Sequence, residues 1–165
     1  MKRTVRLLTS FFGVGYFPFA PATLATAITA VLLYLTGTPT ASRYFLILPC
    51  LFLSGVYLST AAEREWGKDS GKIVIDEILG FLVAIAFLPF EPFGGTGHGL
   101  ALAFFLFRFY DIVKPFPAGW SQSFTGGWGV MTDDLFAGLY TNVTLRIFVW
   151  LFSGKDPGGF PFTLN

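Results

Sequence analysis

Five long apolar segments constrain the fold of this chain more than any other feature. They cover residues 22–35, 44–62, 73–89, 100–113 and 135–152. A helix that crosses a bilayer needs about 20 mostly apolar residues, so the first segment is short for a crossing. Charged residues make up 13% of the chain, whereas an ordinary globular domain has about 25%. We therefore predict an all-α fold: an integral membrane helical bundle of about five hydrophobic helices, in a single membrane-embedded domain over residues 1–165.

The two ends of the chain differ from these segments. Basic residues precede the first apolar stretch, as they do in a signal peptide. Glycines and a proline between residues 13 and 18 interrupt that stretch before it becomes a sustained helix. We therefore favour an amphipathic interfacial helix over residues 1–12, or a re-entrant segment, over a cleavable signal. The tail, residues 153–165, is rich in Gly and Pro and is expected to be coil.

Lysine and arginine predict how the chain is oriented. If the N-terminus is cytoplasmic, five crossings place eight basic residues at the inner face and only Arg43 and Lys155 outside. Arg146 lies within the last segment, near enough to its outer end for its side chain to reach water. The same topology puts most acidic residues at the inner face. We therefore expect any chemistry to face the cytoplasm.

Several classes of function are disfavoured. The net charge is +1 and there is no basic run, so nucleic acid is not an expected partner. Cys50 is the only cysteine, which excludes a disulfide within the chain and zinc-type cysteine spacing. His98 is the only histidine and lies in a glycine-rich loop on the outer side, so we interpret it as a loop residue rather than a ligand.

Two pairs of adjacent carboxylates stand at the inner ends of apolar segments. Asp76-Glu77 is followed at helical spacing by Gly80, and Asp133-Asp134 is followed by Gly138. Small residues allow two helices to approach closely, so both pairs are expected to border a helix–helix contact. The alternative is that the acids only cap a helix or complement its dipole.

A third charged group lies at the inner end of the fourth segment. Arg108, Asp111 and Lys114 are spaced by three and share one helix face. Such spacing can simply stabilise a helix end. Arg108, however, interrupts an otherwise apolar run, and ionisable residues within a span are functional-site candidates.

The available donors favour a hard cation. Carboxylate oxygens suit Mg²⁺, with Mn²⁺ as an alternative, and no His or Cys is expected at the inner face for zinc or copper. Cations beside acids at a lipid–water boundary suit a phosphate on a lipid headgroup. Two glycine-bearing loops, residues 13–15 and 126–129, could bring backbone amides close to a phosphate, although flexible turns are the usual explanation.

Four ordered blocks of sequence resemble a known family. They are GVGYFPFAP at residues 13–21, DSGKIVIDEILG at 69–80, FRFYDIVKPFP at 107–117 and GGWGVMTDD at 126–134, the last followed by Ala137-Gly138. In order and spacing they are similar to the signature blocks of phosphatidylglycerophosphatase A. The resemblance covers residues 13–140. It implies a multi-pass enzyme of the bacterial inner membrane that hydrolyses phosphatidylglycerophosphate to phosphatidylglycerol and inorganic phosphate in a Mg²⁺-dependent step.

The resemblance also implies roles for individual residues. The metal ligands would be Asp76, Glu77, Asp133 and Asp134, and the catalytic acids Asp76, Asp111 and Asp134. Asp111 would be a further ligand or the base that orients the attacking water. The phosphate or headgroup would be held by Arg108 and Lys114, with Lys72 as an outer contact. Oligomeric state and the number of ions stay open.

Two positions depart from the family pattern. Ala22 stands where the family usually has glycine. Residues 118–123, AGWSQS, replace an expected basic residue and Asp–Arg pair, so we expect the substrate to be held differently here. Two other classes of protein remain alternatives. One is a small transporter or channel with an interfacial acidic ion site, and the other is a non-catalytic membrane assembly protein.

Overall fold

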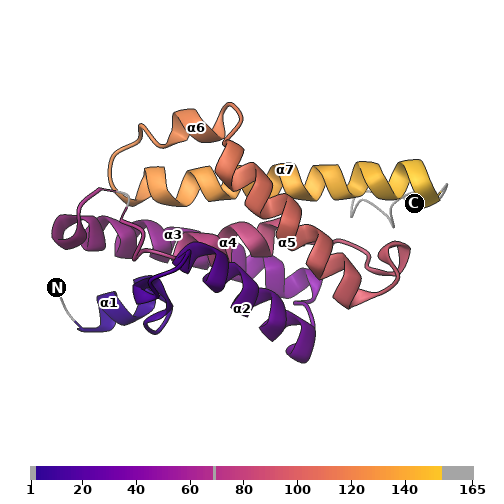
Figure 1. Cartoon of the computed structure of the whole chain (residues 1–165), viewed down its shortest axis with the longest axis horizontal. Coiled ribbons are helices and arrows are strands. Elements are labelled where there is room, and N and C mark those ends of the chain that lie inside the picture. Colours follow the sequence, from indigo (N-terminus) through magenta and orange to yellow (C-terminus); the bar gives the residue numbers. More distant parts are fainter. Residues whose placement is uncertain (1–2, 69, 154–165) are drawn as a thin grey trace.

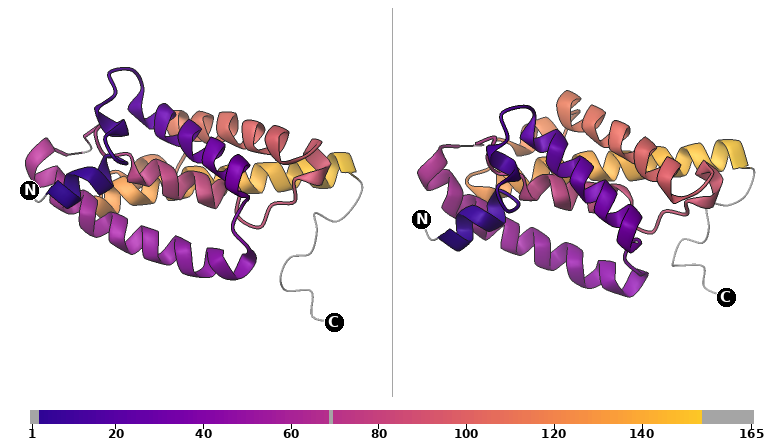
Figure 2. Two further views of the ribbon diagram at one scale, coloured as in Figure 1. Left: turned by 90° about the horizontal axis from the view of Figure 1, so that it is seen from below. Right: turned by 60° about the horizontal axis from the view of Figure 1, so that its bottom comes forward.

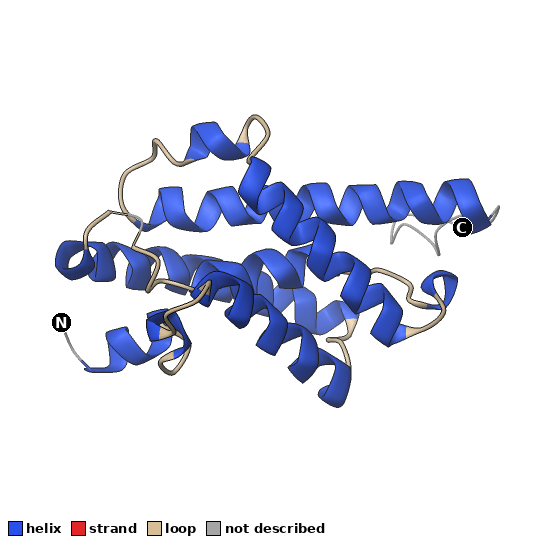
Figure 3. Cartoon of the chain, viewed as in Figure 1, coloured by secondary structure: helices blue, strands red, loops and turns tan. Residues whose placement is uncertain are grey.

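The computed structural model describes residues 3–68 and 70–153, and in this part of the chain it shows helices and loops without strands (Figure 3). The all-α prediction is confirmed. The α-helices are α1 (Arg3–Thr9), α2 (Pro21–Thr36), α3 (Ala41–Trp66), α4 (Ile75–Ala84), α5 (Thr96–Val113), α6 (Ala118–Ser121) and α7 (Gly127–Ser153), with 3₁₀ turns η1 (Val14–Tyr16) and η2 (Glu91–Phe93). The predicted coil tail lies outside the described residues, apart from Ser153 at the end of α7.

The long helices α3 and α7 run along the length of the molecule, and the shorter α4 lies between them (Figures 1 and 2). Helix α2 lies beside α4 and α5, and α1 packs on α3. All five predicted apolar segments contain a helix. Helix α7 begins eight residues before the predicted segment, at Gly127 rather than 135. The acidic pair Asp133-Asp134 therefore lies in the second turn of α7 and does not cap the helix.

The third segment does not form the full helix predicted over residues 73–89. Helix α4 ends at Ala84 after ten residues, which is about 15 Å of helix at 1.5 Å per residue. A bilayer core is about 30 Å thick, so α4 can reach only about half-way across one. This part of the prediction is wrong, because hydropathy reports apolar residues and does not report where a helix stops.

Two polar residues of α7 explain how α4 can end among apolar side chains. Asn142 donates from Nδ2 to the carbonyls of Val83, Ala84 and Ala86 at 2.9–3.2 Å. Arg146 donates from Nη2 to the carbonyls of Ala86 and Phe87. Backbone carbonyls at a buried helix end need such partners. Arg146, which the sequence placed near enough to the outer end of its segment to reach water, is thus partly exposed while it donates to these carbonyls.

Close approach of α4 and α7 brings the two acidic pairs together. A Cβ on Gly138 would lie 2.3 Å from the Gly80 carbonyl oxygen, and one on Gly80 would lie 2.7 Å from the Asp134 carbonyl oxygen. Real Cβ atoms do not approach that closely, so the crossing requires glycine at both positions. The predicted stripe of small residues is therefore a helix–helix contact.

Much of the outer surface is apolar. Large side chains are more than 55% exposed along α2, α3, α5 and α7, among them Leu35, Phe45, Tyr57, Phe105 and Trp150. Within the described residues, α3 is the one helix that is both long and apolar enough to cross a membrane by length and composition, and α2 is apolar but shorter.

The N-terminal segment packs on the loop before α4. The chain leaves α1 through Phe11 and Phe12, both in the left-handed conformation, so the helix is shorter than the predicted residues 1–12. A Cβ on Gly15 would lie 2.1 Å from the Lys72 carbonyl oxygen, and Val74 donates its N–H to the carbonyl of Thr9 at 2.9 Å. These contacts fix the segment that precedes the acidic pair Asp76-Glu77.

Candidate active site

Three buried carboxylates from three helices meet at the centre of the bundle. Glu77 comes from the first turn of α4, Asp111 from the last turn of α5 and Asp134 from the second turn of α7. Each offers one oxygen, and the three oxygens lie within 4.8 Å of one another. This spacing is small enough for one cation to contact all three carboxylates.

Arg108 links two of these acids. Its Nη1 atom lies 2.6 Å from Glu77 Oε2 and 3.0 Å from Asp111 Oδ2. The hydroxyl of Thr26 in α2 also donates to Glu77 Oε2, at 3.0 Å. The guanidinium side chain is only 14% exposed, so water screens these ion pairs weakly. The cluster therefore carries a positive charge beside its carboxylates before any ion binds.

Asp134 supplies the observation that tests whether a metal fits. Its Oδ2 atom is buried and has no hydrogen-bond partner among the described residues. A buried carboxylate oxygen without a partner carries a high desolvation cost, which a bound cation would offset. An all-oxygen donor set of Glu77, Asp111 and Asp134 suits Mg²⁺ or Mn²⁺. The residues present fit such an ion.

A second charged group lies beside the first. Lys114 ends α5 in the left-handed conformation, and its Nζ lies 2.5 Å from Asp133 Oδ2 and 3.5 Å from Asp111 Oδ1. Gln122 donates to the same Asp133 oxygen at 3.0 Å. Burial alone would lower the pKa of Lys114, but Asp133, with Asp134 and Asp111, raises it above its usual value. Lys114 is therefore held as an ammonium ion.

Of the other two predicted site residues, Asp76 lies close enough to Asp133 and Asp134 for their charges to repel, and Lys72 lies at the margin. Asp76 is half-buried in the first turn of α4, where its Oδ1 accepts the N–H of Glu77 at 3.1 Å. Lys72 is exposed, and its ammonium lies 5.7 Å from the ring centroid of Tyr16 and 5.8 Å from that of Trp66. The structure thus brings seven of the eight predicted site residues together and places Lys72 in an aromatic contact. The seven are Asp76, Glu77, Arg108, Asp111, Lys114, Asp133 and Asp134.

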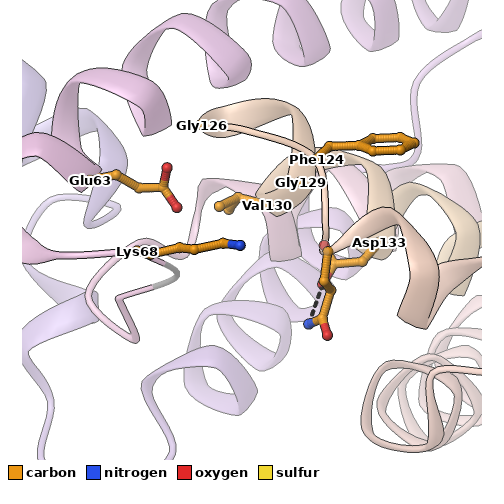
Figure 4. Close-up of a pocket in the computed structure, with 8 residues that line it drawn as sticks. Glu63, Lys68, Phe124, Gly126, Gly129, Val130 and Asp133 are labelled. Atoms are coloured by element: carbon orange, nitrogen blue, oxygen red, sulfur yellow. Dashed lines mark hydrogen bonds between the residues drawn. The ribbon is translucent and has the colours of Figure 1, made fainter.

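A polar cavity of about 310 Å³ opens beside Asp133. Figure 4 shows Glu63 and Lys68 on one side of it, and Asp133, Gly129 and Phe124 on the other, with Val130 between them. Gln122 also lines this cavity. The cavity lies next to the charged cluster and is large enough to hold a small headgroup or water molecules.

Sequence reasoning missed Thr26, Gln122 and Lys68. Thr26 is a polar residue in an apolar segment, and its contact with Glu77 identifies it. Gln122 lies in the atypical segment 118–123, but only its contact with Asp133 assigns it to the site. The second glycine-bearing loop, residues 126–129, allows α7 to pack closely on α3. A Cβ on Gly127 would lie 2.2 Å from the Val56 carbonyl oxygen, and the N–H of Gly127 donates to the Thr60 hydroxyl.

Comparison with known proteins identifies relatives over most of the chain. A family model described as phosphatidylglycerophosphatase A matches residues 7–149. The chain is 34% identical over 148 residues to a phosphatidylglycerophosphatase A of Haemophilus influenzae, covering 86% of each protein. It is 31% identical over 141 residues to that of Escherichia coli, covering 84% of this chain and 80% of the relative. It is also 33% identical over 150 residues to a Bacteroides thetaiotaomicron protein provisionally named phosphatidylinositol-3-phosphatase, covering 88% of this chain and 93% of the relative. No solved structure matches the chain significantly.

Proposed function

This chain belongs to the phosphatidylglycerophosphatase A family, and we propose that it hydrolyses the phosphomonoester of phosphatidylglycerophosphate to give phosphatidylglycerol and inorganic phosphate. Membership of this family makes it a phosphoric monoester hydrolase. The observation that carries the proposal is the convergence of Glu77, Asp111 and Asp134 within 4.8 Å beside the Arg108 guanidinium. A phosphate ester needs this combination of anionic metal ligands and a fixed cation.

We assign Glu77, Asp111 and Asp134 as the ligands of Mg²⁺. When bound, the ion would neutralise phosphoryl oxygens and make a coordinated water a better nucleophile. The unpartnered Asp134 Oδ2 supports this assignment. The metal roles of Asp76 and Asp133 stay predictions. Asp133 is engaged through Oδ2 by Lys114 and Gln122, and through Oδ1 it accepts the N–H of Asp134.

Arg108 and Lys114 would hold the phosphate. Both are cations that now contact the carboxylates, and they lie on successive turns at the inner end of α5. With a divalent ion on those carboxylates, Arg108 and Lys114 would be free to bind the substrate's phosphoryl oxygens. Arg offers planar paired donors and Lys a point charge, which together favour a phosphate dianion.

We further propose that the helices lie in the inner membrane with the active site at the cytoplasmic face. The exposed apolar side chains along α2, α3, α5 and α7 support embedding in lipid. The excess of Lys and Arg on one side supports the orientation. A transporter or channel is disfavoured because the relatives are named as phosphatases.

The test is a phosphate-release assay on the purified protein in detergent with Mg²⁺. Phosphatidylglycerophosphate is compared with phosphatidic acid, phosphatidylinositol 3-phosphate and a soluble monoester. The inositol lipid is included because one relative carries that name. We expect the highest kcat/KM with phosphatidylglycerophosphate. Preference for the inositol lipid would replace the proposed substrate while keeping the reaction, and no release from any ester would refute the function.

A further inference from the structure

An open apolar groove runs along the seam between α2 and α5. It has a volume of about 420 Å³ and is lined by Ala27, Ala30, Val31 and Tyr34 of α2 and by Gly97, Leu100, Ala101, Phe104 and Phe105 of α5. Val31, Tyr34 and Phe105 are each more than half exposed. The groove is therefore an accessible surface channel and not part of the packed core.

Contacts at the two ends of the seam fix its direction. At one end, a Cβ on Gly97 would lie 3.3 Å from Tyr34 Cε2, so the first turn of α5 meets the last turns of α2. At the other end, Thr26 of α2 and Arg108 of α5 both donate to Glu77 Oε2. The helices are thus antiparallel, and one end of the seam is the charged cluster.

The groove ends within about one helical turn of the candidate active site. Ala27 directly follows Thr26, and Phe104 and Phe105 lie one helical turn before Arg108. From Gly97 to Phe105 the groove is about 12 Å long at 1.5 Å per residue. One leaflet of a bilayer contributes about 15 Å of hydrocarbon, half of a core of about 30 Å. A ligand with its phosphate at Arg108 would therefore place its polar headgroup beside Phe104 and Phe105 and extend an acyl chain further along the groove, towards Tyr34 and Gly97.

We propose that the α2–α5 groove binds an acyl chain of the lipid substrate while its phosphate lies at Arg108 and the carboxylates. The proposal rests on the proposed function, because it takes the ligand to be a phospholipid monoester. It predicts that Ala101 and Val31 influence which lengths of acyl chain the protein prefers. These residues are exposed in the middle of the groove, where a large side chain would fill it without touching the charged cluster.

The kinetic test compares Ala101→Trp and Val31→Trp with wild type. Cys50→Trp, on the exposed part of α3, is the matched control for adding a large aromatic residue. Each protein is assayed with long-chain phosphatidylglycerophosphate and with the same headgroup after removal of both acyl chains. We expect the groove variants to raise KM for the long-chain lipid about tenfold or more, since contacts with several methylenes are lost. Turnover of the deacylated headgroup should not change. Unchanged KM for the long-chain lipid, or equal losses on both substrates, would overturn the proposal.

A binding measurement keeps the inference separate from the proposed reaction. In Tyr34→Trp, which replaces one exposed aromatic side chain of the groove by another and leaves the groove open, the added fluorescence should be quenched more by brominated acyl chains on phosphatidylglycerophosphate than by the same chains on phosphatidylcholine. Equal quenching would show that any bilayer lipid fills the groove and would reject a substrate site. This readout does not depend on turnover, so it remains decisive even if wild type fails to release phosphate from the lipid.

Discussion

Arg108 Nη1 lies 2.6 Å from Glu77 Oε2, and this contact joins the C-terminal part of α5 to the first turn of α4. Both residues lie in apolar helices, where a single unpaired charge is costly. Their pairing lets the bundle keep both charges at its centre without bound substrate. It also places a cation beside the carboxylate oxygens that we assign to a metal.

Loss of the Asp134 carboxylate charge should stop catalysis. Asp134→Asn keeps the size of the side chain but removes an anionic oxygen that is buried without a partner. We expect phosphate release to fall by about 10²-fold or more. Glu91→Gln, an exposed carboxyl in η2, is the control and should retain wild-type turnover. Near wild-type activity of Asp134→Asn would remove the basis for its metal role.

Divalent cations should bind to and stabilise the protein as well as activate it. Excess EDTA is expected to abolish phosphate release and Mg²⁺ to restore it. Because an ion bound to the folded state stabilises it by about RT ln(1 + [L]/Kd), the melting temperature should rise with Mg²⁺ concentration. Asp134→Asn should lose this rise. Hydrolysis that persists in chelator, or an identical thermal shift in the variant, would contradict the proposed ligand set.

Catalysis should depend on the planar shape of the Arg108 side chain and not only on its positive charge. Arg108→Lys retains a cation but loses the planar donors that reach both Glu77 and Asp111. We expect kcat to decrease about 10²-fold, with Arg108→Ala lower still. Arg43→Lys, at the exposed start of α3, is the matched control. The assignment is wrong if Arg108→Lys turns over phosphatidylglycerophosphate as fast as that control.

The α4–α7 crossing should not tolerate a methyl group. Gly138→Ala puts a Cβ 2.3 Å from the Gly80 carbonyl oxygen, so the helices must separate. Overpacking of this kind typically costs about 1–3 kcal/mol, and it should lower both the melting temperature and activity. Gly71→Ala adds the same methyl group where no atom lies within 4 Å, and it should behave as wild type. Equal stability of the two variants would show that the crossing is not tight.

The orientation can be tested with single cysteines in a Cys50→Ser background. A cysteine replacing Ser70, in the loop before α4, should react with an impermeant thiol reagent only from the cytoplasmic side. A cysteine replacing His98, near the start of α5, should react only from outside. Reversed labelling would invert the topology, and labelling of both from the same side would rule out a crossing between residues 70 and 98.

Local sequence was sufficient to place three of the long helices and to identify the acidic residues. Apolar runs bounded by glycine and proline predicted α2, α3 and α5 to within a few residues, because helix formation depends mainly on neighbouring residues. The four sequence blocks were sufficient to identify the family. The early end of α4 was not predictable in this way, because its carbonyls are capped by Asn142 and Arg146 from a helix that follows more than 50 residues later.

Tertiary structure alone decided which carboxylates meet. The sequence grouped Asp76 with Glu77 and Asp133 with Asp134 as neighbours, yet consecutive helix residues point about 100° apart. The crossing at Gly80 and Gly138 turns Glu77 and Asp134 towards Asp111, while Asp133 faces Lys114 and Gln122. The local geometry of a helix determines which of its residues share a face. The distance between two such faces depends on how closely separate helices pack, and here two glycines set that distance.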